Sequence, residues 1–206
     1  MNIIDKQTTS EIVEKKSRFI ANLYYVETRE QAEEKIKEVK KKYHDARHNC
    51  SAYRILEGQS IIEKSSDDGE PSGTAGSPML NILQKNDIVN CVVIVTRYFG
   101  GILLGTGGLV RAYSDVTIKT IEEADKIVVC LGREYEIKID YGDAENVKYY
   151  CRKNNINIIK MEYLDKTICN LEIENDFINK FLEDIEKRTL NILEYKDMGE
   201  KYIRKK

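Results

Sequence analysis

The first third of the chain alternates apolar and polar residues in patterns typical of a strand, a helix and a hairpin. Residues 18–26 place Phe19, Ala21 and Leu23 on one face, which predicts a strand. Residues 28–43 carry apolar side chains at helical spacing, and Thr28 is suited to cap that helix at its N-terminus. Residues 47–55 and 59–65 flank a short polar turn and predict a hairpin.

The next apolar segments predict a helix, a buried strand and a second helix. Residues 76–86 read as a short helix that tolerates Pro78 only in its first turn. Residues 90–98 are almost continuously apolar, which is typical of a central strand covered on both faces. A longer helix follows. We expect its buried face to consist of Leu109, Ala112 or Tyr113, Val116 and Thr120.

The pattern restarts near Leu131 and predicts a second domain. A strand carrying Tyr135, a helix, two strands, a helix and a last strand at 190–198 follow one another. The order β-α-β-β-α-β is that of a ferredoxin-like domain. We therefore predict an α+β protein whose domains span residues 1–130 and 131–206. We expect a linker within residues 128–134 and a frayed basic tail at residues 200–206.

Composition restricts the class of protein. The 206 residues are 41% hydrophobic and 33% charged, which is enough to build a core. The net charge of −2 restricts any nucleic-acid binding to a local surface. No apolar run approaches the ~20 residues that cross a bilayer, and the N-terminus lacks a signal-peptide pattern. We expect a cytoplasmic protein without membrane partners. The five cysteines include no C-x-x-C pair, which favours buried reduced thiols over zinc or disulfides.

Both prolines lie in the segment SSDDGEPSGTAGSP at residues 65–78, which also holds three carboxylates. Its Asp-Gly and Pro-Ser-Gly pairs favour turns. The alternative is an acidic cluster that binds a cation or transfers protons, because neighbouring carboxylates raise one another's pKa values. The spacing does not match a calcium-binding loop. We interpret the segment as a turn that shapes a binding surface.

Five glycines lie in RYFGGILLGTGGLVRAY at residues 97–113, between a predicted strand and a helix. Backbone N–H groups at such a place can bind phosphate, and Arg97 and Arg111 flank it. Thr106 and Gly107 stand where a P-loop needs Lys and Ser or Thr, so no particular nucleotide is indicated. The alternatives are that glycine permits close packing and that Arg111 pairs with Asp115 along the helix. We expect this segment and the acidic loop to lie side by side.

The segments ARHNCSAYRI, DDGEPSGTAGSPML and VVIVTRYFGGILLGTGGLVRAYS resemble the IMPACT/YigZ family, from about Lys15 to Ser114. The resemblance implies a first domain similar in fold to domain 2 of ribosomal protein S5 and a ferredoxin-like second domain. Eukaryotic relatives are implicated in regulating translation. Some bacterial members have carried a proline-peptidase label, which this sequence does not support because no two-metal ligand pattern is visible.

The resemblance also implies a binding site in the first domain. We assign no catalytic residue, metal or cofactor to this site. Its expected partners are RNA, the ribosome or a translation-related protein, because Arg97 and its aromatic neighbours could stack on bases. The alternatives are an enzyme or binder of a phosphorylated small molecule, and a protein–protein adaptor. The implied residues are His48, Asp67, Asp68, Gly69, Glu70, Pro71, Ser72, Gly73, Thr74, Arg97, Tyr98, Phe99, Gly100, Gly101, Gly105, Thr106, Gly107, Gly108 and Arg111.

Overall fold

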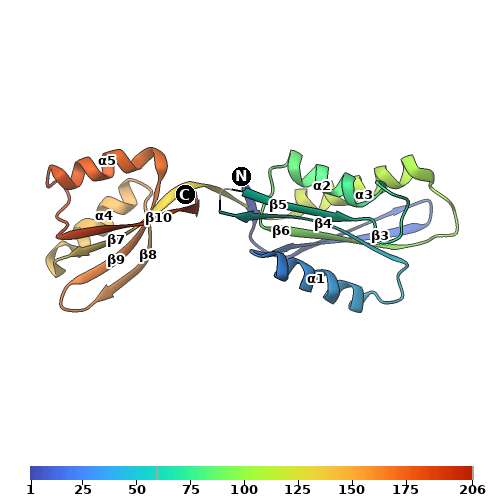
Figure 1. The fold of residues 1–206 in the computed structure, drawn as a ribbon, viewed down its shortest axis with the longest axis horizontal. Coiled ribbons are helices and arrows are strands. Elements are labelled where there is room, and N and C mark those ends of the chain that lie inside the picture. Colours follow the sequence, from blue (N-terminus) through green and yellow to red (C-terminus); the bar gives the residue numbers. More distant parts are fainter. Residues whose placement is uncertain (59, 206) are drawn as a thin grey trace. The chain divides into compact units, whose positions relative to one another are not determined.

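The computed structural model describes residues 1–58 and 60–205, and it divides the chain into two compact units. The first unit spans Met1–Ile127 and the second Val128–Lys206. Each unit has its own antiparallel sheet and its own helices (Figure 1). Within the described residues, no helix is long and apolar enough to cross a membrane. The predicted α+β class is confirmed, whereas independent folding at the predicted domain limits stays a prediction.

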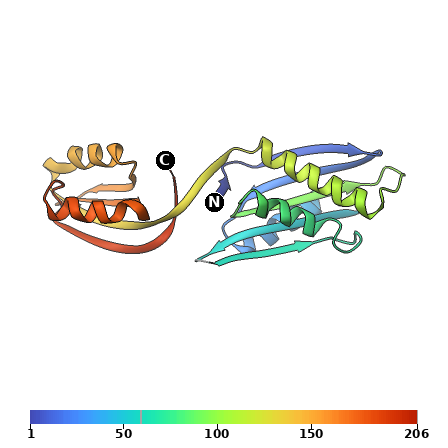
Figure 2. The ribbon, with the colours of Figure 1, turned by 90° about the horizontal axis from the view of Figure 1, so that it is seen from above.

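The first unit is a five-stranded sheet between helices. In sheet order the strands are β2 (Thr8–Glu14), β3 (Ser17–Tyr25), β6 (Cys91–Tyr98), β4 (His48–Glu57) and β5 (Ser60–Ser66). One face carries α1 (Arg29–Lys42), and the other carries α2 (Gly76–Lys85) and α3 (Gly105–Glu123) (Figures 1 and 2). The short β1 (Asn2–Ile4) is not part of this sheet. It is hydrogen-bonded to β7 (Lys126–Ile139), and Asn2 N donates a hydrogen bond to Asp87 O.

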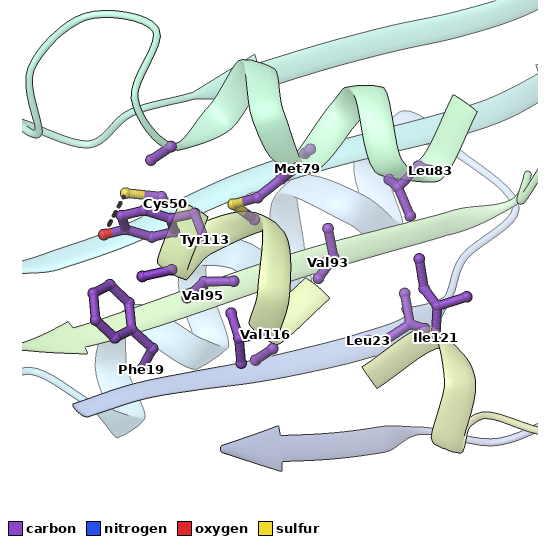
Figure 3. Close-up of a cluster of buried hydrophobic side chains, with 14 of the residues drawn as sticks. Phe19, Leu23, Cys50, Met79, Leu83, Val93, Val95, Tyr113, Val116 and Ile121 are labelled. Atoms are coloured by element: carbon purple, nitrogen blue, oxygen red, sulfur yellow. Dashed lines mark hydrogen bonds between the residues drawn. The ribbon is translucent and has the colours of Figure 1, made fainter. Parts of the chain in front are cut away.

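The central strand β6 explains why the core has two sides. Val93 and Val95 face the apolar cluster beneath α2 and α3, and Val92 and Ile94 face the cluster beneath α1. All four side chains are fully buried, as the continuous apolar run predicted. Figure 3 shows the α2 and α3 side of this core.

The other predicted elements of the first unit are confirmed as well. Thr28 caps α1 by accepting a hydrogen bond from Gln31 N at 3.2 Å, and Pro78 lies in the first turn of α2. The hairpin of β4 and β5 forms, and Gln59 within it lies outside the described residues. Strands β1 and β2 were not predicted. β1 is too short for a periodic pattern, and β2 is an edge strand whose polar residues gave no clear alternation.

The second unit has the predicted order of elements. Its sheet runs β10 (Glu194–Arg204), β7 (Lys126–Ile139), β9 (Thr167–Glu174) and β8 (Asn157–Tyr163), and all neighbours are antiparallel. A single turn (Tyr141–Asp143) precedes α4 (Ala144–Lys153), and α5 (Asn175–Glu186) follows β9. Both helices pack on one apolar cluster with the sheet, which is the ferredoxin-like arrangement.

The prediction of a frayed C-terminal tail was wrong, and the segment expected as a linker has strand structure. The expected linker at 128–134 is part of β7, which pairs with β10 on one side and, from Gly132, with β9 on the other. The expected frayed tail belongs to β10 as far as Arg204, and Lys206 lies outside the described residues. The physical reason is the packing of Ile203 in β10, which is 3% exposed. Ile203 lies so close to Gly132 of β7 that a Cβ on Gly132 would overlap it.

Candidate functional site

Four segments meet at one end of the first unit's sheet. β4 begins at His48, which lies opposite Arg97 near the end of β6. The acidic loop, residues 67–75, connects β5 to α2, and residues 99–104 connect β6 to α3. Because neighbouring strands start and finish here, segments far apart in the sequence come together.

A pocket of 390 Å³ opens at this place, and we call it the sheet-end pocket. Both loops line it, as expected. Of the predicted site residues, it is lined by His48, Gly69, Glu70, Pro71, Arg97, Phe99, Gly105 and Thr106. Sequence reasoning missed the lining residues Arg47, Leu103 and Leu104. Leu109, expected on the buried face of its helix, also lines the pocket. That this pocket binds a ligand stays a prediction.

The inner wall of the pocket holds a buried ion pair. Arg97 Nη1 lies 2.7 Å from Glu70 Oε1, and the two side chains are 8% and 3% exposed. The Tyr113 hydroxyl donates to the same oxygen at 2.9 Å. The Arg97 guanidinium also lies 5.5 Å from the ring centroid of Phe19 and 5.7 Å from that of Phe99. Arg97 is therefore not the open cation that the sequence suggested, because Glu70 already offsets its charge.

Arg97 nevertheless keeps unused hydrogen-bonding capacity. Its Nε–H is buried and has no acceptor among the described residues. A guanidinium carries five N–H donors, and Glu70 Oε1 is its one hydrogen-bonded acceptor within the described chain. A buried donor without a partner is costly, so the pocket wall presents a polar group that an acceptor on a ligand could satisfy.

Cys50 and Tyr113 lie behind this wall. Cys50 Sγ is 2.9 Å from the Asp67 carbonyl oxygen and 3.3 Å from the Tyr113 hydroxyl, the contact drawn as a dashed line in Figure 3. Burial raises the pKa of Cys50 to about 12. Burial also raises the pKa of Tyr113, and the nearby Cys50 and Glu70 raise it further. Both groups stay protonated at neutral pH, so they are suited to hydrogen bonding and not to nucleophilic attack.

Asp67 has a structural role in the acidic loop. Its carboxylate accepts hydrogen bonds from Gly73 N at 2.8 Å, Ala75 N at 3.0 Å and Gly76 N at 2.8 Å. Ala75 occupies the N-cap of α2 and offers no side-chain acceptor, so Asp67 caps the helix from a distance. Burial alone would raise the pKa of Asp67, but the three backbone donors outweigh it and lower the pKa.

The variant Asp67→Asn is expected to lower the unfolding free energy at pH 7 by about 2 kcal/mol, because an amide has one acceptor oxygen for three donors. A carboxyl with a lowered folded-state pKa stabilises the protein above its ordinary pKa of about 3.9, and that stability is lost as the pH falls through the folded-state value. Urea unfolding between pH 7 and pH 2 should therefore show that the unfolding free energy of the variant falls less steeply toward low pH than that of the wild type. An identical pH dependence would contradict the capping role.

The remaining carboxylate of the acidic loop is also engaged. Asp68 accepts from Lys40 Nζ at 2.6 Å and from Asn49 N at 2.7 Å. Its backbone carbonyl lies 2.8 Å from His48 Nδ1, which donates in the corresponding tautomer. Within the described residues, no group of three or more His, Cys, Asp or Glu side chains could hold a metal ion. The carboxylates of Asp67 and Asp68 are thus engaged by groups of the protein itself, and residues 69–71 of the loop line the pocket.

The glycine-rich segment is divided between a loop and a helix. Gly105–Gly108 form the first turn of α3 and not a loop before it. The N-cap residue Leu104 makes no side-chain hydrogen bond to this turn, so it does not cap the first N–H groups of α3. Arg111 is exposed, does not line the pocket, and forms no ion pair with Asp115 within the described chain. That Arg111 takes part in binding an anion stays a prediction.

The other predicted residues surround the pocket without lining it. Tyr98 donates to Asp45 Oδ1 at 2.8 Å, and the Thr74 hydroxyl donates to Pro71 O at 2.6 Å. Gly100 N donates to Ser17 Oγ at 3.2 Å. The residues that lie outside the lining are Asp67, Asp68, Ser72, Gly73, Thr74, Tyr98, Gly100, Gly101, Gly107, Gly108 and Arg111.

Comparison with known proteins relates this arrangement to other chains. The Impact N-terminal domain matches residues 15–121. The IMPACT family member YvyE of Bacillus subtilis (strain 168) is 39% identical over 173 residues, which are 84% of this chain and 79% of that protein. The IMPACT family member YigZ of Escherichia coli (strain K12) is 31% identical over 183 residues, 87% and 90% of the two chains. A crystal structure described as that of a hypothetical protein is 30% identical, with a TM-score of 0.60 and coverage of 93% and 95%.

Proposed function

The chain belongs to the IMPACT family, and on that premise we propose that it is a translation-related protein that binds RNA through the sheet-end pocket. The role in translation is supported by the resemblance to a family whose eukaryotic members are implicated in translational regulation. The choice of RNA is supported by the chemistry of the pocket, which pairs a surface for stacking with groups that attract phosphate.

One observation carries the RNA proposal: exposed apolar side chains and the N-terminus of α3, whose N-cap residue makes no side-chain hydrogen bond, line the same pocket. Phe99 is 48% exposed and Leu103 is 82% exposed, although both are large and apolar. A base can stack on the aromatic ring of Phe99 and contact the apolar side chain of Leu103, and a phosphate group is stabilised by the N–H groups and the dipole of a helix N-terminus. Arg97, which is nine-tenths buried and has an unpartnered Nε–H, lines the same pocket.

Further cations near the pocket favour a strand of RNA over a single phosphate. Arg47 is exposed at the rim, and Lys15 and Lys16 are exposed at the tip of the β2–β3 hairpin. None of the three forms an ion pair with a described residue. The hairpin tip lies against the pocket segment, because an added Cβ on Gly100 would overlap the backbone of Lys16. Cations placed beyond the pocket can contact successive phosphates along a strand.

The second candidate is a binder of a phosphorylated small molecule, and the size of the pocket favours it. A volume of 390 Å³ lies in the range that holds nucleotide-sized ligands. This candidate needs the pocket and α3, but it does not need Lys15 and Lys16. The two candidates therefore differ in which cations they require.

The triple variant Lys15→Gln/Lys16→Gln/Arg47→Gln is expected to weaken binding of a single-stranded RNA octamer at least about tenfold at moderate salt, because phosphate contacts depend on cations. Phe99→Ala is expected to weaken the same binding by about 1–3 kcal/mol through lost stacking. Fluorescence anisotropy at several salt concentrations measures both effects. The triple variant should also show a smaller salt dependence.

The matched control is Lys6→Gln/Lys37→Gln/Lys85→Gln, which removes three exposed lysines of the same unit that do not line the pocket. The RNA affinity of this control should stay within about twofold of that of the wild type. If the protein attracted RNA only through its overall charge, both triple variants would lose the same affinity. AMP that binds as tightly as the octamer, unaffected by the changes at Lys15 and Lys16, would favour the small-molecule candidate. Equal loss in both triples would contradict the RNA proposal.

A further inference from the structure

A groove on the helical face of the second unit lies apart from the residues discussed so far. It has a volume of 470 Å³ and runs between α4, α5 and the segment 188–191 that follows α5. Val147 and Leu190 lie at its buried base, and Tyr149 is 63% exposed along it. α4 and α5 lie on the same side of the sheet, as Figure 2 shows. We call it the α4–α5 groove.

Three cations line this groove. Lys153 ends α4, Lys180 lies within α5, and Arg188 follows α5. All three are exposed, and none has a carboxylate within 4.0 Å among the described residues. Lys180 lies 5.2 Å above the ring of Phe177. Most other lysines of the second unit are paired, for example Lys148 with Glu145, Lys160 with Glu162 and Lys201 with Glu134.

The carboxylates of the groove do not cancel these cations. Asp184 Oδ2 accepts a hydrogen bond from the Tyr150 hydroxyl at 2.6 Å. Partial burial raises the pKa of Tyr150, and the hydrogen bond to Asp184 raises it further, so the hydroxyl remains a donor. Asp143 contacts Asn146 Nδ2 at 3.5 Å. The lining of the groove therefore has three cations and two carboxylates, and one of these carboxylates already accepts a short hydrogen bond. The net charge of the lining is positive.

The backbone at Arg188 supports a role for its side chain. Arg188 has φ of 54°, in the left-handed region, directly after the helix-ending residue Lys187. Glycine is preferred at this position because a side chain adds strain there. Strained backbone tends to persist where the surrounding structure or a function requires it. Here the residue held at that position brings a guanidinium to the groove.

We infer that the α4–α5 groove binds a phosphate group through Lys153, Lys180 and Arg188, with the exposed Tyr149 ring placed to stack on an attached base. Guanidinium and ammonium groups are the usual protein partners of phosphate. An RNA strand and a free phosphorylated small molecule share this chemistry. The inference rests on residues of the second unit alone and does not depend on the function proposed for the sheet-end pocket.

The most informative variant is Arg188→Gly in the full chain. It removes the guanidinium and relieves the left-handed backbone, so its thermal unfolding midpoint should equal or exceed that of the wild type. Its affinity for pyrophosphate, followed by NMR titration of backbone amides, should nevertheless fall at least about fivefold. In the wild type, the shifted amides should include residues 188–191. A higher midpoint with unchanged affinity would overturn the inference.

A second pair of variants tests the lysines. Lys153→Gln/Lys180→Gln should weaken pyrophosphate binding at least about tenfold, whereas Lys160→Gln/Lys196→Gln, which lies outside the groove, should stay within about twofold. Equal losses in both pairs would overturn the inference. Titration with AMP and with an RNA octamer distinguishes the two sources of phosphate. The triple variant at Lys15, Lys16 and Arg47 should retain groove binding, so failure of either proposal can be recognised separately.

Discussion

The variant Arg97→Met is expected to lose about 3–5 kcal/mol of unfolding free energy, because it leaves the Glu70 carboxylate buried without its cation. Glu70 is 3% exposed at its side chain and would keep the Tyr113 hydroxyl as its remaining strong partner. Methionine has a similar length and stays apolar between Phe19 and Phe99, so lost volume contributes little. Urea unfolding at pH 7 measures the loss.

Two controls separate the charge from the packing. The double variant Arg97→Met/Glu70→Gln should recover most of the loss, since the neutral amide can still accept from Tyr113 and no buried charge remains unpaired. Lys35→Met breaks the exposed pair with Glu38, whose side chains are 36% and 53% exposed, and should cost less than about 1 kcal/mol. A loss for Arg97→Met as small as that for Lys35→Met would show that the pair contributes little.

The variant Gly100→Ala is expected to cost about 3 kcal/mol or more, because the new Cβ would overlap the carbonyl group of Lys16 and the nitrogen of Ser17. These are backbone atoms of a two-residue hairpin turn, in which Lys15 and Lys16 have φ of 44° and 65°. Such a turn has little freedom to move away. We expect the variant to unfold at a lower urea concentration and to weaken RNA binding by displacing the hairpin tip.

The matched control for Gly100 is its neighbour. Gly101 has φ of 84° and open space around an added Cβ, so Gly101→Ala should cost only the backbone strain, about 1–2 kcal/mol. The difference between the two variants therefore isolates the close approach of the loop to the hairpin. Equal costs for Gly100→Ala and Gly101→Ala would indicate that the hairpin does not lie against the loop.

The elements with strong local patterns were predictable without any structure. The valine-rich run of β6, the Thr28 cap of α1 and the order of elements in the second unit each depend on residues close together in the sequence. The buried face of α3 was predicted for the same reason, and Leu109, Val116 and Thr120 are buried as expected. Propensity and periodicity act over a few residues, so a short window contains their full signal.

The sequence predicted where the candidate site lies in the chain, but it did not predict how the side chains of the site interact. The turn and glycine signals located the two loops that line the sheet-end pocket. They did not show that Asp67 caps α2 or that Arg97 is paired with Glu70. Leu103 was missed because an exposed apolar residue in a loop has no distinctive local pattern.

The sequence by itself determined most of the helices and the strands with strong local patterns, and it located the two loops that line the sheet-end pocket in the first half of the chain. The tertiary structure alone decided which charges are offset and which remain open. Glu70, Arg97 and Tyr113 meet from three separate elements, and Glu200–Arg204 became a strand only by pairing with β7. The reason is physical: side-chain pairing across a sheet depends on strand register and layer packing, which arise from contacts between residues distant in the sequence.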